Sequence, residues 1–449
     1  MLCAAQWRWV GPRTRRFTAW LRAVPETILV LVAGGALFCL AHYVNLKQFS
    51  NSFSWWLNAN PPELLFYALL PVLLFNAAMR VKWYYFRTSL FTIMIFAFLM
   101  VVLNTMLTGL LLQYTVVKVG TTIGVNALGG WNLYHGFTLG AILSSTDPVA
   151  VISFMEENNA PAMLATVIEG ESLFNDATAY ILFQAFLQSA MLGLPAKPPA
   201  DIVAEVAYAG SVGVGVGLTC GLILVVIVRS LHEQRTLETN FTLAMAYLSF
   251  YLAQGVLNAS GPVAVTTCGL FMASSGLAAV SPNARNHLLA FWDCVCFISN
   301  TVIFFYSGAL AMAMLTSEGL VASDTVLAQQ GRQDLEGQGE SDANVTQFVG
   351  TVILGMPVIY VSQYLLRGLW IALMYPFMGH LGFAEEDRSP GTAIFLTSSA
   401  LRGGVNLIMA LIVAQMPSKE IPIGVKFFLT IWAVAFVLLT LLVNAPMIP

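Results

Sequence analysis

The segment LGAILSSTDPVAVISF, residues 139–154, is apolar over most of its length but contains an aspartate followed directly by a proline. A carboxylate is costly in hydrocarbon, and a proline has no N–H group with which to continue a helix. Its ring also clashes with the carbonyl four residues back, so the sequence predicts a helix that breaks around Thr146, Asp147 and Pro148. At membrane depth, such a break is tolerated only where protein or a water-filled cavity covers it.

The overall composition is that of a membrane protein. Of the 449 residues, 58% are hydrophobic and only 10% are charged, and the mean hydropathy is +0.76. Soluble domains carry about a quarter charged residues. The cysteines and histidines show no metal-ligand spacing, so we expect neither a disulfide framework nor a cofactor. The expected partner is a lipid bilayer, and no nucleic-acid partner is expected.

Twelve segments are long and apolar enough to span a bilayer, which requires about 20 mostly apolar residues. They are residues 26–44, 62–80, 88–113, 133–155, 161–190, 203–228, 237–257, 260–279, 288–314, 347–377, 390–414 and 424–446. The predicted fold is therefore an all-α polytopic membrane protein, with a transmembrane domain over residues 26–449. An even number of spans places both termini on one side of the membrane.

Basic residues in the loops indicate which side is cytoplasmic, because Lys and Arg are enriched in cytoplasmic loops. One set of alternate loops holds twelve: Arg8, Arg13, Arg15, Arg16, Arg22, Arg80, Lys82, Arg87, Arg229, Arg235, Arg285 and Arg388. The opposite set holds six: Lys47, Lys118, Lys197, Arg332, Lys419 and Lys426. Residues 1–25 are thus predicted to form a basic cytoplasmic segment, both termini to be cytoplasmic, and the acidic loop near 315–346 to face outward.

Two arginines and four acids lie inside the apolar spans and require an explanation. A lone arginine in hydrocarbon costs at least ~2.5–3.5 kcal/mol, and ionisable groups at this depth usually mark functional sites. The arginines are Arg367 and Arg402, and the acids are Asp147, Glu169, Glu171 and Asp176. Three of the acids belong to EGESLFND, residues 169–176, in which Ser172 and Asp176 share a helix face. Glu169 and, on another span, Asp293 are expected near the inner surface, with Asp293 solvated.

Asp147 and Asp176 are predicted to lie near the middle of the membrane. Asp147 is about fourteen residues from the outer end of its span, and Asp176 is about fifteen from the inner end of the next. The carbonyls freed by the break, the Thr146 hydroxyl and the Asp147 carboxylate are hard oxygen ligands that suit a small cation. Broken helices at this depth are the usual substrate sites of secondary transporters.

A second segment is similar to the first break. TSSALRGGV, residues 397–405, aligns with LSSTDPVAV, residues 143–151, at both serines and at the final valine, with an offset of 254 residues. Gly403 and Gly404 are expected to loosen the later helix as Pro148 breaks the earlier one. We therefore predict two related repeats, at about 26–190 and 237–446, joined by a linker helix at about 203–228. Each repeat contributes one of two crossing broken helices.

Five motifs, spread in order over nearly the whole chain, resemble the sodium/proton exchanger (NhaP-like) family of monovalent cation/proton antiporters. The resemblance is closest to the plant plasma-membrane salt-tolerance branch of that family. The motifs are LLPVLLFNAA (69–78), SSTDPVAV (144–151), EGESLFND (169–176), FWDCVCFISNTVIFFYSG (291–308) and SSALRGGVNL (398–407). The combination of TDPVAV with EGESLFND is highly specific.

The resemblance implies an inverted-repeat antiporter, usually a homodimer, that exchanges Na⁺ or K⁺ for H⁺ by alternating access in the plasma membrane. By motif position, Asp176 would be the carboxylate shared by cation and proton. Thr146, Asp147 and Ser172 would complete the ion shell. Asn175 would be the asparagine that accompanies electroneutral exchange in this family.

The resemblance also assigns the two intramembrane arginines. Arg367 would pair with Glu171, an interaction that we interpret mainly as a structural salt bridge. Arg402 would lie at the second helix break.

Three features depart from the family. Relatives usually carry an acid at the position of Asn76, which bears on cation affinity or selectivity. They usually have thirteen spans, and they usually have a cytoplasmic regulatory tail after the last one, so a fragment or a short member is expected.

A single site that binds either a cation or a proton at Asp176 would couple the two fluxes. Burial and the like charge of Asp147 favour the neutral acid, whereas a dehydrated Na⁺ supplies the opposite charge and competes with the proton. An empty, ionised site would be too costly to carry across the barrier. Because Asn175 is uncharged, the expected exchange is one for one and electroneutral.

Other interpretations remain. Asp176 could pair with an arginine, Asp147 could stabilise the kink, and Thr146 and Ser172 could bond the carbonyl four residues back. An intramembrane aspartyl protease also has two aspartates on neighbouring helices, but its Y-D and G-x-G-D signatures are missing here. A cation channel would need a glycine filter, which is also missing. The sequence favours a transporter over an enzyme, but it does not choose among Na⁺, K⁺ and Li⁺, because selectivity depends on cavity size.

Overall fold

The computed structural model describes residues 26–43, 64–114, 131–149, 151–152, 155, 161–191, 197–231, 234–315, 341–375, 390–416 and 420–447. Within these ranges the chain is helical and contains no strand. The helices are α2 (Glu26–Tyr43), α5 (Leu70–Arg80), α6 (Trp83–Met94), α7 (Val101–Leu112), α9 (Leu133–Ser144), α11 (Ala162–Ala190), α12 (Pro199–Ser230), α13 (Arg235–Tyr251), α14 (Gly261–Phe271), α15 (Leu277–Ala279), α16 (Pro282–Leu315), α19 (Ser341–Met374), α20 (Pro390–Ser398), α21 (Gly404–Gln415) and α22 (Ile423–Met447). Short π-helical turns at Leu65–Leu69, Ile95–Met100, Leu252–Val256 and Met272–Gly276 adjoin these helices.

Each of the twelve predicted spans overlaps helix in the described residues. Among those residues, six helices are at least 18 residues long and apolar enough to cross a membrane, and three shorter helices are also apolar. α19 begins at Ser341, earlier than the predicted start of its span at 347, so the end of the predicted outer loop is helical. The basic segment 1–25 and most of that loop lie outside the described residues.

The first helix break confirms the prediction from the Asp-Pro pair. α9 ends at Ser144, and Ser145, its C-terminal cap, is already extended with φ −62° and ψ 141°. The non-helical stretch runs from Ser145 to Pro148 and so begins one residue earlier than expected. The position follows from the proline, because a continued helix would bring its ring against the Ser144 carbonyl.

The second break is longer than the two glycines predicted. α20 ends at Ser398 and α21 begins at Gly404, so Gly404 is the first residue of a helix rather than part of the break. Gly403 has a different role. A methyl group at this position would overlap the Asp147 carboxylate, so the residue must be glycine for the two breaks to approach each other.

The two broken helices cross at their non-helical segments. The backbone N–H of Asp147 donates to the Leu401 carbonyl at 2.8 Å. The side-chain amide of Asn406, on α21, donates to the carbonyls of Ile142 (2.5 Å) and Ser145 (3.1 Å). Each break thereby supplies partners for backbone groups that the other leaves free, as membrane depth requires.

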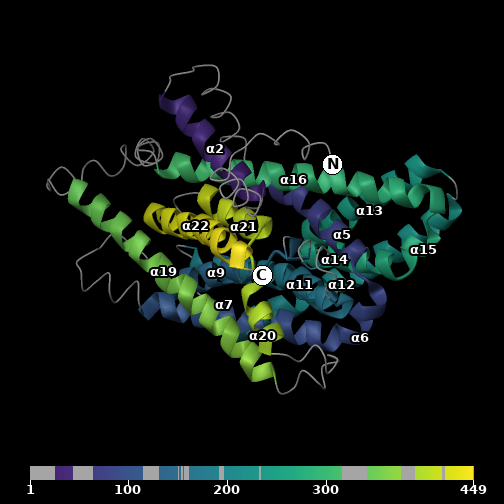
Figure 1. The fold of residues 1–449 in the computed structure, drawn as a ribbon, viewed down its shortest axis with the longest axis horizontal. Coiled ribbons are helices and arrows are strands. Elements are labelled where there is room, and N and C mark those ends of the chain that lie inside the picture. The colour runs from purple at the N-terminus through teal and green to yellow at the C-terminus, as the bar shows by residue number, and fades with distance from the viewer. Residues whose placement is uncertain are drawn as a thin grey trace, which may run out of the picture.

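The helices pack in two groups on either side of this crossing. α2 packs on α16, and α14 packs on α5, α12 and α13. In the other group, α9 packs on α7 and α11, α21 on α22, and α19 on α20. Figure 1 shows α12, α13, α14 and α15 gathered at one end of the molecule, α19 along the opposite edge, and α9, α11, α21 and α22 between them. Contacts of α11 with α14 and of α16 with α21 join the two groups.

The contact between α2 and α16 depends on two glycines. A methyl group at Gly308 would overlap the Leu31 carbonyl oxygen, and one at Gly34 would overlap that of Phe305. The backbones of the two helices therefore touch directly, as at other small-residue interfaces between membrane helices.

Gly308→Ala should destabilise the protein by about 1–3 kcal/mol, because the added methyl group must push the two helices apart. The measurement is the thermal unfolding midpoint of the detergent-purified protein. The matched control is Gly215→Ala on α12, where nothing lies within 4 Å of the added carbon. That control should keep or raise the midpoint, and equal losses in both variants would contradict the assignment.

Candidate functional site

A cavity of about 680 Å³ lies beside the crossing of the broken helices. Its walls come from α5, α11, α16, α21 and the first break. Its lining includes the half-buried carboxylates of Asp147 and Asp176 and the exposed side chains of Arg80, Lys82 and Arg285. The cavity therefore leads from the two intramembrane carboxylates to the side whose loops carry these basic residues.

Asp176 lies on α11, half-buried and facing the cavity. The hydroxyl group of Ser145 donates a hydrogen bond to its carboxylate. Ser145 was not among the predicted site residues, although it belongs to the motif that was singled out. Only the structure, in which Ser145 is extended rather than helical, brings its side chain to α11.

Thr146 receives two hydrogen bonds from α11. The hydroxyl group of Ser172 donates to the Thr146 carbonyl, and the Asn175 amide donates to the Thr146 hydroxyl at 3.1 Å. Ser172 thus bonds the neighbouring break rather than the carbonyl four residues back on its own helix. Both Thr146 oxygens keep a second lone pair, which can face a cation.

The Asp147 side chain contacts the backbone that follows it and the second break. The N–H of Val149 donates to its carboxylate at 3.0 Å, which is a local turn after an aspartate. The carboxylate lines the same cavity as that of Asp176, and Gly403 lies against it from the other broken helix. The structure therefore places Asp147, Asp176, Thr146 and Ser172 around one space.

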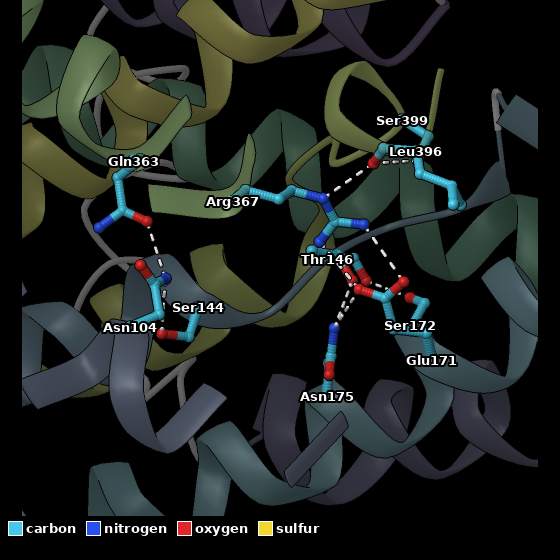
Figure 2. A network of polar contacts seen from close by, with 10 residues as sticks. All are labelled: Asn104, Ser144, Thr146, Glu171, Ser172, Asn175, Gln363, Arg367, Leu396 and Ser399. Carbon is cyan, nitrogen blue, oxygen red and sulfur yellow. Dashed lines mark hydrogen bonds and ion pairs between the residues drawn. The ribbon is translucent and has the colours of Figure 1, made fainter. Parts of the chain in front are cut away.

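Glu171 and Arg367 form a buried ion pair on the other face of α11. Two guanidinium nitrogens of Arg367 lie 2.8 and 3.2 Å from the two carboxylate oxygens, a bidentate arrangement, and its Nε donates to the Leu396 carbonyl at 2.9 Å. The Asn175 amide also contacts Glu171, at 3.3 Å. Figure 2 shows the Asn175 amide pointing toward both Thr146 and Glu171. Asn175 therefore links the ion pair to the helix break.

Arg402 lies in the second break, as the resemblance implied. It is 5% exposed, and its guanidinium is 5.8 Å from the centre of the Phe436 ring. It shares a small polar cavity of about 20 Å³ with Glu171, Asn175 and Arg367. Its charge is therefore buried close to the acids of α11.

A neighbouring polar network was not predicted. The amide of Asn104 on α7 donates to Gln363 of α19 at 2.8 Å and to Ser144 at 3.2 Å (Figure 2). Gln363 is four residues before Arg367, so the two share a face of α19. That spacing was the available signal, because an intramembrane amide beside an intramembrane arginine marks a polar helix face.

Asn76 lines the large cavity, and its side-chain oxygen accepts a hydrogen bond from Nε of Arg80 at 3.0 Å. Glu169 also lines the cavity. Among the described residues, no three His, Cys, Asp or Glu side chains are arranged to hold a metal ion. The groups that face the cavity beside Asp176 are carboxylate, hydroxyl and carbonyl oxygens, which suit alkali cations.

Two broken helices that cross beside buried carboxylates, with a cavity leading to one side, are the architecture of secondary transporters with a mid-membrane site. The family model for the transmembrane region of sodium/hydrogen exchangers matches residues 11–447. The chain belongs to this family, whose members are transporters, as the five motifs predicted. Together with its apolar helices, this makes the chain an integral membrane protein.

Individual relatives agree with this assignment. The chain is 31% identical over 428 residues to sodium/hydrogen exchanger 7 of Arabidopsis thaliana. The aligned region covers 94% of this chain and 33% of that protein. It is 32% identical over 294 residues to the low-affinity Na⁺/H⁺ antiporter NhaS1 of Synechocystis. The aligned region covers 64% of this chain and 49% of that protein. The chain thus spans between a third and a half of the length of these relatives.

A solved structure has the same fold. The sodium proton antiporter MjNhaP1 of Methanocaldococcus jannaschii superposes with a TM-score of 0.67 over 94% of this chain and 90% of that one, at 16% sequence identity. The polytopic helical fold with two crossing broken helices is therefore the NhaP fold.

Glu171→Gln should destabilise the protein by about 3–5 kcal/mol, because it leaves the buried guanidinium of Arg367 without a counter-charge. The measurement is the thermal unfolding midpoint, and the double variant Glu171→Gln/Arg367→Gln should recover much of the loss. A Glu171→Gln midpoint equal to that of the wild type would show that the pair is not needed for stability.

Proposed function

We propose that this protein is a secondary antiporter that exchanges Na⁺ for H⁺ across a membrane and is not an enzyme. The observation that carries the proposal is the position of Asp176, which lies half-buried beside the crossing of the broken helices in a cavity that is also lined by exposed residues. Na⁺ is proposed over K⁺ or Li⁺ because the matched relatives are Na⁺/H⁺ antiporters and exchangers by name.

The proposed cation site has Asp176 as its central ligand. Asp147 supplies a second carboxylate, and Thr146 supplies a hydroxyl and a carbonyl oxygen from the extended break. Ser172 and Ser145 already hydrogen-bond to these oxygens. Their hydroxyl groups would turn their own oxygens toward an arriving ion. A bound cation and a proton on Asp176 would exclude one another, because each neutralises the same carboxylate.

Transport is proposed to proceed by alternating access. The lining of the large cavity includes the exposed side chains of Arg80, Lys82 and Arg285. The side that carries these residues is proposed to be the cytoplasm, with both termini there, and the membrane to be the plasma membrane. The site lies between the two helix groups, so a shift of one group against the other would open it to the opposite side. The same proposal includes that the two halves of the chain are inverted repeats and that the protein assembles as a homodimer.

Exchange is proposed to be one for one. Asn175 is uncharged, and the charges of Glu171 and Arg367 compensate each other away from the large cavity. One positive charge therefore crosses in each direction, and no net charge moves.

Asp176→Asn should abolish Na⁺-driven proton movement, because the amide can neither release a proton nor neutralise a cation. Purified protein in liposomes with an entrapped pH dye provides the assay, repeated with Na⁺, K⁺ and Li⁺. The matched control is Asp201→Asn, which removes an exposed carboxylate in the first turn of α12 and should exchange normally. Full exchange by a folded Asp176→Asn protein would refute the proposal.

The exchange rate should not change with membrane potential, because an electroneutral cycle does no work against the electric field. The potential is set with a potassium gradient and an ionophore, and the initial rate of Na⁺/H⁺ exchange is measured at several values. The pH gradient is held constant throughout. A rate that rises or falls steadily with the potential would exclude one-for-one exchange.

A further inference from the structure

The lining of the large cavity includes charged side chains that the proposed ion site does not use, and the exposed ones among them mark its mouth. Three are basic, Arg80, Lys82 and Arg285, and two are acidic, Glu169 and Asp293. Charges that line a cleft change the local concentration of an ion that must pass through it. A cation that enters this cavity is therefore exposed to the field of these groups as well as to that of Asp176.

Arg80 is fixed across this mouth by three hydrogen bonds. Its Nη2 donates to the Asp293 carboxylate at 2.5 Å and to the Leu289 carbonyl at 3.1 Å, and its Nε donates to Asn76 at 3.0 Å. The guanidinium of α5 is thereby held against α16. Asp293 is the only carboxylate with which Arg80 forms a salt bridge among the described residues.

We infer that Asp293 controls the apparent affinity for the transported cation by neutralising Arg80 at the cavity mouth. This inference rests on the proposed antiport. Asp293 does not need to bind the ion itself. When the Asp293 carboxylate is present, the Arg80–Asp293 pair has no net charge toward an approaching cation. When it is removed, the positive charge of Arg80 is uncompensated, because the other side chain that Arg80 contacts, Asn76, is an uncharged amide.

A purely structural role for the pair would be to hold α5 against α16. Other contacts already do this, because Phe75 and Trp292 stack across the same two helices with ring centroids 4.8 Å apart. The Arg80 and Asp293 side chains are 34% and 62% exposed. Ion pairs this exposed contribute little to stability, but their charges still act on a nearby ion.

The two interpretations differ in the sign of a measurable effect. The Michaelis constant for Na⁺ is measured in liposomes for Asp293→Asn, Arg80→Gln and the double variant. Asp293→Asn should raise this constant by about two- to tenfold with little change in maximal rate, as expected for one unpaired charge at intermediate dielectric. Arg80→Gln should lower it, because the remaining Asp293 carboxylate attracts the cation. The double variant, which has neither charge, should return close to the wild type.

Ionic strength supplies a second readout. Raising it with a large organic cation that does not compete should shrink the effect of Asp293→Asn, because exposed charges are screened. The matched control is Glu205→Gln, which removes the acid of an ion pair with Lys197 (2.6 Å) that is similarly half-exposed but does not line the cavity. This control should leave the Michaelis constant unchanged.

Several outcomes would overturn the inference. An equal rise of the Michaelis constant in Asp293→Asn and Arg80→Gln would indicate that the pair only holds α5 against α16. Unchanged constants in both variants would show that the pair does not act on the ion. If Asp293→Asn does not fold, Arg80→Gln decides alone: a lower Michaelis constant supports the inference, and an unchanged or higher one overturns it. A wild-type protein without exchange would instead refute the proposed function.

Discussion

The hydrogen bond from the backbone N–H of Asp147 to the Leu401 carbonyl is the interaction on which the site depends. A broken helix at membrane depth exposes backbone groups that lipid cannot satisfy. In this protein the two breaks satisfy one another, with the Asn406 amide covering carbonyls of the first break. These hydrogen bonds bring segments about 250 residues apart in the chain together at one point. Asp147, Arg402 and Asp176 are neighbours for that reason.

The intramembrane charges are divided between two faces of α11. On one face, Glu171 and Arg367 pair with each other inside the protein, with Arg402 close to them. On the other face, Asp176 and Asp147 line the large cavity and have hydroxyl, amide and backbone groups as their neighbours. The first set is held as a fixed ion pair, whereas the two carboxylates of the second set form no salt bridge among the described residues and face a cavity that a mobile cation can enter. Asn175 lies between the sets and contacts both Glu171 and Thr146.

Prediction from the sequence succeeded where the signal was local. The Asp-Pro pair located the first break to within a residue, and each segment chosen by hydropathy overlaps helix in the described residues, because both signals depend on the backbone and on the apolar character of one segment. It failed where partners are distant. Asp293 is exposed, as expected, but its pairing with Arg80 of α5 was missed, because no periodicity links positions 213 residues apart. The Asn104–Gln363 contact was missed for the same reason.

The sequence by itself determined that the chain is a bundle of membrane helices, that one helix breaks at Asp147, and which ionisable groups are placed in hydrocarbon. These follow from transfer free energies and backbone chemistry, which each segment carries with it. Only the tertiary structure decided that Ser145 faces Asp176, that Gly403 must be glycine against Asp147, and that the cavity leads to one side. Those features arise from the packing of segments far apart in the chain, where contact geometry is fixed by both partners at once.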